Sequence, residues 1–150
     1  LETDGETRFV VVGDASAVPS YDKQLQALAD DRVRFVPFIP EKATLMGLLR
    51  LCRVFVFPST VEAMSMMLLE AASLETPVVC SDIPENVSVL PDQAVYFESG
   101  NSADLANRLR WALEHPAEMT ALAQQAGDWV NQHHAWDTIV HQYELLYANV

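Results

Sequence analysis

The chain has 150 residues, which is enough for one domain with a hydrophobic core. Half of the residues are hydrophobic and 20% are charged, as in a globular protein in water. The 21 acidic residues outweigh the 9 basic ones and give a net charge of −12, which argues against nucleic acid or an anionic membrane surface as the primary partner.

The chain ends and the cysteines give a first expectation about origin and location. The sequence begins at Leu1 without Met and shows no signal peptide, which predicts an excised fragment. Cys52 and Cys80 lie near apolar runs, and no metal-binding or redox spacing connects them. We interpret them as buried free thiols in a reducing compartment, which predicts a cytoplasmic protein.

The first elements are a strand over 8–12, a helix over 21–29 and a strand over 33–35. The first strand ends at Gly13, which either lets a ligand approach the backbone or simply closes the strand. No GxGxxG or Walker sequence follows, so a nicotinamide dehydrogenase is poorly supported. The predicted helix places its apolar residues on one side: Leu25, Leu28 and Ala29.

The central stretch, residues 53–82, predicts a strand, a loop, a helix and a second strand. Residues 54–57 form a continuous apolar run typical of a buried strand. Residues 64–73 are rich in Met, Leu and Ala, which favour helix. Residues 77–80 begin the next buried strand. Such a βαβ unit predicts that the two strands are parallel.

Two carboxylates, Glu62 and Glu70, flank the start of this central helix. The free N–H groups of a first helical turn attract anions. Together these groups suit a ligand that carries both phosphate and hydroxyl groups, such as a nucleotide sugar. The alternative is that both residues only complement the helix dipole or face solvent. Because Glu70 lies in an otherwise apolar helix that we expect to be buried, neither interpretation is excluded.

The other predicted elements complete an alternation of strands and helices. They are a helix from Pro40–Glu41 with a buried stripe of Leu45, Leu48 and Leu49, a loop or one-turn helix at 83–86, a strand over 94–97, and helices over 102–114, 117–132 and 136–147. The aromatic stripe of the last helix, which includes Trp136 and Tyr143, predicts packing rather than a ligand site. This order predicts an α/β fold with a doubly wound, mostly parallel Rossmann-like sheet. Ligands bind such sheets beyond the carboxyl ends of the strands, where we expect the loops after the strands to converge on one crevice.

Several motifs in this order resemble one known family. They are Phe57-Pro58-Ser59, the pair Glu62 and Glu70 with seven residues between them, and the run from Thr76-Pro77 to Ser81-Asp82. They resemble the donor-binding core of retaining GT-B glycosyltransferases of family 4, the glycosyl transferases group 1. The similarity continues at Val10–Asp14, Asp31–Ile39 and the helix from Trp136. The resemblance implies that residues 1–150 are the C-terminal, donor-binding domain, and that the N-terminal acceptor domain is absent.

The resemblance also implies roles for residues. Glu62 would be the catalytic residue, in contact with the donor sugar, and Glu70 would bind the ribose hydroxyls. The implied substrate-binding set comprises Gly13, Asp14, Phe38, Ile39, Ser59, Ala63, Met64, Ser65, Met66, Met67 and Glu70. The implied donor is a UDP- or GDP-linked sugar, with no other cofactor and no metal. The other implied partners are the missing N-terminal domain, which the last helix would reach, and an acceptor that can be membrane-associated.

Two departures and three alternatives accompany this resemblance. Ala63-Met64-Ser65 replaces the Gly-Phe-Gly that is frequent in the family, so the sugar pocket can differ in shape. The Arg and Lys that family members place on the diphosphate have no counterpart here, so we expect the fragment alone to be inactive. The alternatives are a regulatory module such as a phospho-receiver, another GT-B enzyme such as an epimerase, and a domain that binds without catalysis.

Overall fold

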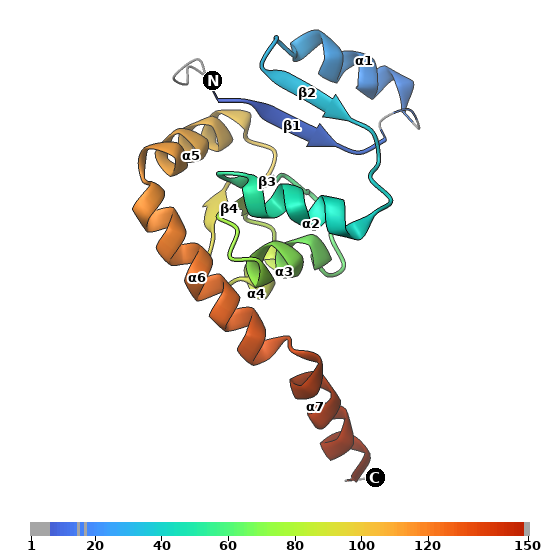
Figure 1. The fold of residues 1–150 in the computed structure, drawn as a ribbon, viewed down its shortest axis with the longest axis vertical. Helices are drawn as coiled ribbons and strands as arrows, with labels where there is room; N and C mark the ends of the chain where they lie inside the picture. Colours follow the sequence, from blue (N-terminus) through green and yellow to red (C-terminus); the bar gives the residue numbers. More distant parts are fainter. Residues whose placement is uncertain (1–6, 15, 17, 149–150) are drawn as a thin grey trace. The chain divides into compact units, whose positions relative to one another are not determined.

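A computed structural model describes residues 7–14, 16 and 18–148, which fall into two compact units (Figure 1). The units are Leu1–Leu45 and Met46–Val150, and their boundary lies within helix α2, Lys42–Leu51. Every strand pair among the described residues is parallel, which confirms the predicted α/β class. The strands are hydrogen-bonded in two sheets, β1–β2 in the first unit and β3–β4–β5 in the second.

The first unit is a small βαβ arrangement. It contains β1 (Phe9–Val12), α1 (Pro19–Leu28) and β2 (Val33–Val36). Phe9 lies opposite Val33 and Val12 opposite Val36. None of the described residues of this unit is buried, and Leu28, predicted to lie on a packed side, is 85% exposed. That prediction is wrong because periodicity identifies an apolar position on a helix without establishing that a neighbour covers it.

The second unit contains a three-stranded sheet and the remaining helices. In chain order after α2 they are β3 (Phe55–Phe57), α3 (Met66–Ser73), β4 (Val78–Ser81), α4 (Pro84–Val89), β5 (Val95–Phe97), α5 (Ser102–Glu114), α6 (Pro116–His133) and α7 (Trp136–Ala148). The sheet order is β3–β4–β5, so the chain after each strand crosses over to the neighbouring parallel strand. The region that we predicted as a loop or a single turn is the short helix α4.

The central strand β4 is buried along its whole length because helices cover both of its faces. Val78 and Cys80 pack in one apolar cluster with residues of α2, α3, α4 and α6. Val79 points to the opposite face and packs in a second cluster, with Leu109 of α5. Alternating side chains of a strand point to opposite faces, so this one strand contributes to both clusters. This packing agrees with the predicted double winding.

Small residues bring α3 and α6 close together. Ala72 in α3 and Ala126 in α6 are fully buried. A Cβ atom added to Gly127 of α6 would lie 3.1 Å from Cγ of Glu75 and 3.3 Å from the carbonyl oxygen of Ala72. Since such contacts are tighter than ordinary van der Waals packing, glycine permits the observed approach. The close packing fixes the position of α3, the helix that carries Glu70.

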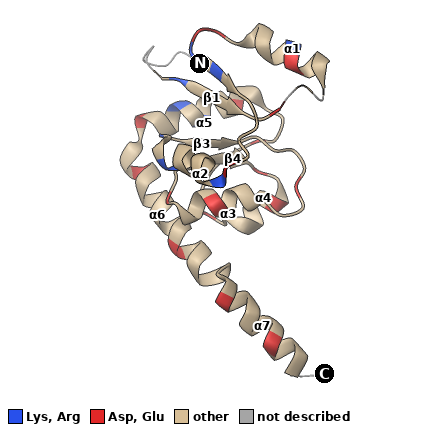
Figure 2. Ribbon diagram, turned by 45° about the vertical axis from the view of Figure 1, so that its right-hand side comes forward, with Lys and Arg blue, Asp and Glu red and all other residues tan. Residues whose placement is uncertain are grey.

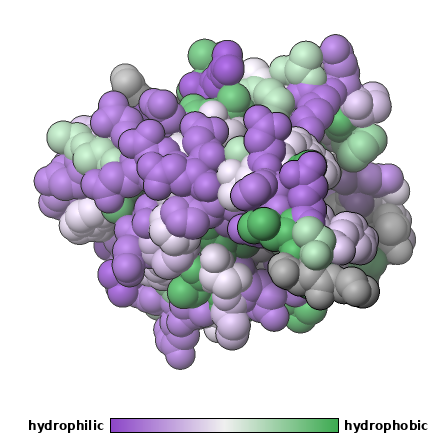
Figure 3. Space-filling model, turned by 90° about the horizontal axis from the view of Figure 1, so that it is seen from below, coloured by the Kyte–Doolittle hydropathy of each residue, from purple (hydrophilic) through white to green (hydrophobic). Residues whose placement is uncertain are grey.

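Acidic residues outnumber basic ones in the sequence, and they are prominent on the C-terminal helices (Figure 2). Figure 2 shows acidic residues on α6 and α7, and neither helix contains Lys or Arg. On the face seen in Figure 3, hydrophilic side chains predominate and apolar ones reach the surface in several separate places. Among the described residues, no helix is both long enough and apolar enough to cross a membrane.

Candidate functional site

The loop between β3 and α3 holds the first candidate carboxylate, Glu62. The hydroxyl of Ser59 donates a hydrogen bond of 2.6 Å to Oε1 of Glu62 and lies 3.2 Å from the carbonyl oxygen of Val61. Hydrogen bonds to an ionised group are stronger than neutral ones. Glu62 is half-buried, so Ser59 restricts the orientation of a carboxylate that solvent still reaches.

The helix α3 begins at Met66 with Ser65 at its N-cap. Serine at this position usually accepts a hydrogen bond from the first helical turn, but here its side chain makes no such bond. The Ser65 hydroxyl donates instead to Oδ1 of Asn86, at 2.5 Å. The N–H of Leu68 donates to the Ser65 carbonyl, whereas the N–H of Met67 donates to none of the described residues. One donor at the helix start is therefore available to a ligand.

The second candidate carboxylate, Glu70, is the fifth residue of α3. The helix buries Leu68, Ala71 and Ala72, and Glu70 is half-buried. The sequence predicted a largely buried helix, but α3 is amphipathic in the structure because only one face packs on the core. Glu70 lies at the margin of that face. Ribose binding by Glu70 stays a prediction.

The remaining candidates around α3 differ in exposure. Ala63 is exposed, and Met64 and Met66 are each 56% exposed. Met67 packs against the hydrophobic core, and the Ser65 side chain is fully buried. A ligand at this junction would therefore meet Ser65 and Met67 through the backbone. The use of these backbone amides by a ligand stays a prediction.

A buried polar network, missed by the sequence reasoning, lies next to this junction. The Asn86 side-chain nitrogen donates to the Ser81 carbonyl at 3.1 Å and lies 2.9 Å from the Ser81 hydroxyl. The Ser81 hydroxyl donates to the carbonyl oxygen of Ser59. We predicted Asn86 in a loop or a one-turn helix and gave it no role. The available signal was an amide side chain five residues after the serine that ends a buried strand.

Asp82, which directly follows β4, has a structural partner. Its Oδ1 accepts a hydrogen bond of 2.8 Å from the N–H of Ser99, in the loop after β5. The Asp82 N–H donates to the carbonyl oxygen of Phe97. These bonds connect the carboxyl ends of two neighbouring strands. A phospho-receiver would use such an acid for chemistry. Because the Asp82 carboxylate is hydrogen-bonded to the Ser99 backbone instead, the phospho-receiver alternative is weakened.

The first unit holds the other four candidates, at the ends of its strands. Gly13 ends β1 with φ of 150°, a backbone angle that favours glycine. Asp14 accepts a hydrogen bond of 2.9 Å from the N–H of Ser16, and hydrogen bonding to Ser16 holds the pKa of Asp14 below its ordinary value. After β2, Phe38 is 69% exposed and Ile39 is half-buried. Convergence of these residues with the loop after β3 stays a prediction.

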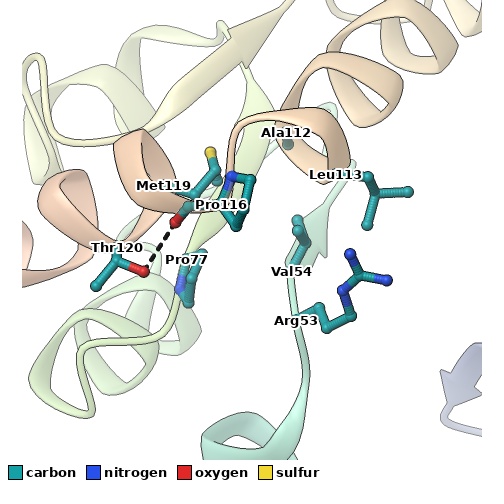
Figure 4. Close-up of a pocket in the computed structure, with 8 residues that line it drawn as sticks. All are labelled: Arg53, Val54, Pro77, Ala112, Leu113, Pro116, Met119 and Thr120. Carbon is teal, nitrogen blue, oxygen red and sulfur yellow. Dashed lines mark hydrogen bonds between the residues drawn. The ribbon is translucent and has the colours of Figure 1, made fainter.

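A small pocket lies at the opposite end of the three-stranded sheet (Figure 4). It has a volume of about 110 Å³ and is lined by Arg53 and Val54 before β3 and by Pro77 before β4, with residues of α5 and α6. These residues precede their strands, whereas Ser59 and Ser81 lie at the carboxyl ends. The pocket is therefore separate from the candidate site.

The described residues contain no group of three or more His, Cys, Asp or Glu side chains that could hold a metal ion. The expectation that the protein needs neither metal nor further cofactor stays a prediction. The candidate site consists instead of carboxylates, hydroxyls and backbone amides, which are hydrogen-bonding groups suited to a polyhydroxylated, phosphorylated ligand.

Parallel strands, helices on both sheet faces and a loop-to-helix junction at the strand ends define an α/β domain of the Rossmann-like class. Residues 1–129 match the family described as glycosyl transferases group 1, and the chain belongs to that family. The family recognised from the motifs is thus confirmed. The chain is also consistent with the C-terminal domain of such a protein.

Known proteins support this assignment at low sequence identity. The chain is 27% identical over 137 residues to glycosyltransferase 1 domain-containing protein 1 of Xenopus tropicalis, covering 88% of the chain and 39% of that protein. The structure of Anabaena HepE with UDP superimposes with a TM-score of 0.83 at 22% identity, over 96% of this chain and 41% of the other. The C-terminal domain of Francisella tularensis LpcC gives 0.78 at 18% identity, over 91% and 74%. The chain thus spans about two fifths of the length of the first two proteins.

Proposed function

We propose that the chain binds a nucleotide-sugar donor, UDP- or GDP-linked, as the donor-binding part of a retaining glycosyltransferase. The observation that carries the proposal is the junction of β3 and α3. There Ser59 orients Glu62, and the first turn of α3 has an N–H that no acceptor among the described residues takes. Family membership supports it. A further support is that the similar Anabaena HepE was crystallised with UDP and with UDP-glucose.

The proposed roles follow from what each group offers. Glu70 accepts hydrogen bonds from the ribose hydroxyls, and the amides from Ser65 to Met67 bind the diphosphate. Glu62 contacts the donor sugar as the catalytic residue. In the reaction, the bond from the anomeric carbon to the diphosphate breaks, and a bond to an acceptor hydroxyl forms with the same configuration. The acceptor hydroxyl gives its proton to the departing phosphate oxygen, and helix-end donors stabilise the departing nucleoside diphosphate.

The full enzyme in this proposal includes an N-terminal acceptor domain. The acceptor is a glycan, a lipid-linked sugar at a membrane or a small molecule. We place the enzyme in the cytoplasm, and the two cysteines, both unpaired, support a reducing compartment. Exposed apolar residues on α7, such as Trp136 and Tyr147, support a role for this helix in contacting the N-terminal domain.

The test is calorimetric titration of the chain with UDP, GDP, ADP and their sugar conjugates, repeated on a protein extended upstream. Glu70→Gln should weaken binding of the preferred nucleotide about tenfold, because a carboxylate is a stronger acceptor than an amide, which corresponds to about 1.4 kcal/mol. Glu118→Gln, the same change at an exposed position of α6, should bind like the parent.

Two outcomes would contradict parts of the proposal. If Glu70→Gln binds as tightly as the parent, the assignment of Glu70 fails. If neither folded protein binds any nucleotide, the donor-binding role fails, and an interaction module becomes the better explanation. Stronger binding by the extended protein would support a donor site completed by upstream residues.

A further inference from the structure

The buried polar network joins four segments of the second unit. Its members are Ser59 after β3, Ser65 at the start of α3, Ser81 at the end of β4 and Asn86 in α4. Ser65, Ser81 and Asn86 are fully buried. Burying polar side chains costs free energy unless each one is hydrogen-bonded, and here each is bonded to another member.

The bonds fix the orientation of the Asn86 amide. The backbone carbonyl of Ser81 can only accept, so the side-chain nitrogen of Asn86 must face it. The opposite atom, Oδ1, then faces Ser65 and accepts from its hydroxyl. A flipped amide would set an oxygen against the carbonyl oxygen of Ser81. The network therefore allows a single arrangement, which specifies where the start of α3 lies relative to β4.

The bond to Asn86 also turns Ser65 away from the role that its position favours. A serine N-cap that bonds to the first turn stabilises a helix by about 1 kcal/mol. Ser65 makes no such bond, and the Met67 N–H is left without an acceptor among the described residues. At its other end the network reaches Ser59, whose hydroxyl holds Glu62. Both ends of the loop 59–65 are thus fixed by the same interior bonds.

We propose that Asn86 is a positioning residue for the part of the donor site that receives the diphosphate and the sugar. Asn86 holds Ser65, which keeps the helix start open, and through Ser81 it holds the segment that orients Glu62. This inference rests on the proposed function. Binding of the nucleoside depends on Glu70, which belongs to α3 itself. Loss of Asn86 should therefore weaken sugar and diphosphate binding more than nucleoside binding.

The first experiment needs no ligand. Three of the five methionines, Met64, Met66 and Met67, flank Ser65, whereas Met119 packs in the hydrophobic cluster on the opposite face of β4. In methyl-labelled protein, Asn86→Ala should shift or broaden the NMR signals of the three flanking methionines and leave the signal of Met119 unchanged. Unchanged signals of the three, or an equal change of the Met119 signal, would overturn the positioning role. Ser65→Ala, which removes one hydroxyl, is the second variant if Asn86→Ala does not fold.

The second experiment compares UMP, UDP and UDP-glucose, or the guanine equivalents if the parent prefers GDP. Asn86→Ala should weaken UDP-glucose binding about tenfold and change UMP binding less than about twofold, where tenfold corresponds to about 1.4 kcal/mol. The matched control is Thr76→Val, which removes another buried hydroxyl that donates to a backbone carbonyl, that of Leu49, at 3.2 Å. The control should weaken all ligands equally or none.

The failures of the two proposals are distinguishable. If UMP and UDP-glucose weaken by the same factor in Asn86→Ala, the residue has only a structural role and the inference is overturned. If the parent binds no nucleotide, the proposed function fails, whereas the methionine signals still decide whether Asn86 positions the loop.

Discussion

The consecutive helices α6 and α7 have similar sequence patterns but different environments. α6 buries Met119, Ala123, Ala126, Gly127 and Val130, whereas α7 has no buried residue. On α7, Trp136 is 82% and Tyr143 56% exposed. We predicted packing rather than a ligand site for this aromatic stripe, and an exposed apolar patch where the last helix would reach the absent domain; among the described residues the stripe is exposed. Periodicity therefore identifies an apolar face, but the surface that covers this face need not belong to the same unit.

The largest expected effect is the difference in free energy of unfolding between a Leu→Ala change in the buried core and the same change on α7. Leu68→Ala, in the α3 core against which α6 packs, should lower the free energy of unfolding by about 3 kcal/mol, because Leu68 is fully buried and a cavity remains. Leu146→Ala on α7, where the side chain is 60% exposed, should change it by less than about 0.5 kcal/mol. Urea unfolding followed by tryptophan fluorescence measures both. Equal losses of stability in the two variants would contradict the difference between the buried core and the exposed helix α7.

The second prediction concerns pH and the buried core. Burial raises the pKa of Cys80 from 9.0 to about 12. The folded state therefore holds the thiol proton more tightly than the unfolded state, so this contribution to stability is complete below pH 9 and is lost as pH rises towards 12. We expect a loss of up to about 1.4 kcal/mol per pH unit above pH 9. Cys80→Ala should reduce the loss of stability per pH unit above pH 9, measured by urea unfolding at several pH values. An unchanged loss would contradict its attribution to the Cys80 thiol.

The third prediction compares two tryptophans. Trp129 of α6 donates from Nε1 to the carbonyl oxygen of Val89, at 3.1 Å. Trp129→Phe should destabilise the second unit by about 1 kcal/mol, because it leaves that carbonyl without its donor. Trp136→Phe on α7 should have no measurable effect, since Trp136 is 82% exposed. Thermal unfolding by circular dichroism decides whether the two substitutions differ.

The smallest expected effect is that of removing α7. Deletion from Trp136 onward should change the stability of the second unit by only ~0.5 kcal/mol, since the helix buries no residue. Hydrogen exchange should show α7 amides exchanging faster than those of α6. Strong protection of α7 in the isolated chain would mean that the helix has a partner surface not apparent from its exposure.

The sequence predicted the elements of the second unit closely. The helix over Ser102–Glu114 has the predicted bounds, and the β3–α3–β4 unit lies where the apolar runs placed it. Ser59, Glu62 and Glu70 became candidates because motif order and spacing can be read from the sequence, and their roles stay predictions. The burial of Glu70 was overestimated, because helix composition does not say which face packs.

The sequence by itself determined the alternation of strands and helices, the parallel α/β class and the family, because these depend on short-range patterns and on motif order. Only the tertiary structure decided that Ser65 bonds to Asn86 rather than capping its own helix. These residues are 21 positions apart, and their contact requires β4 and α4 to return beside α3. Tertiary packing likewise decided that α6 is covered while α7 is exposed, since burial is a property of two surfaces and a sequence pattern describes one.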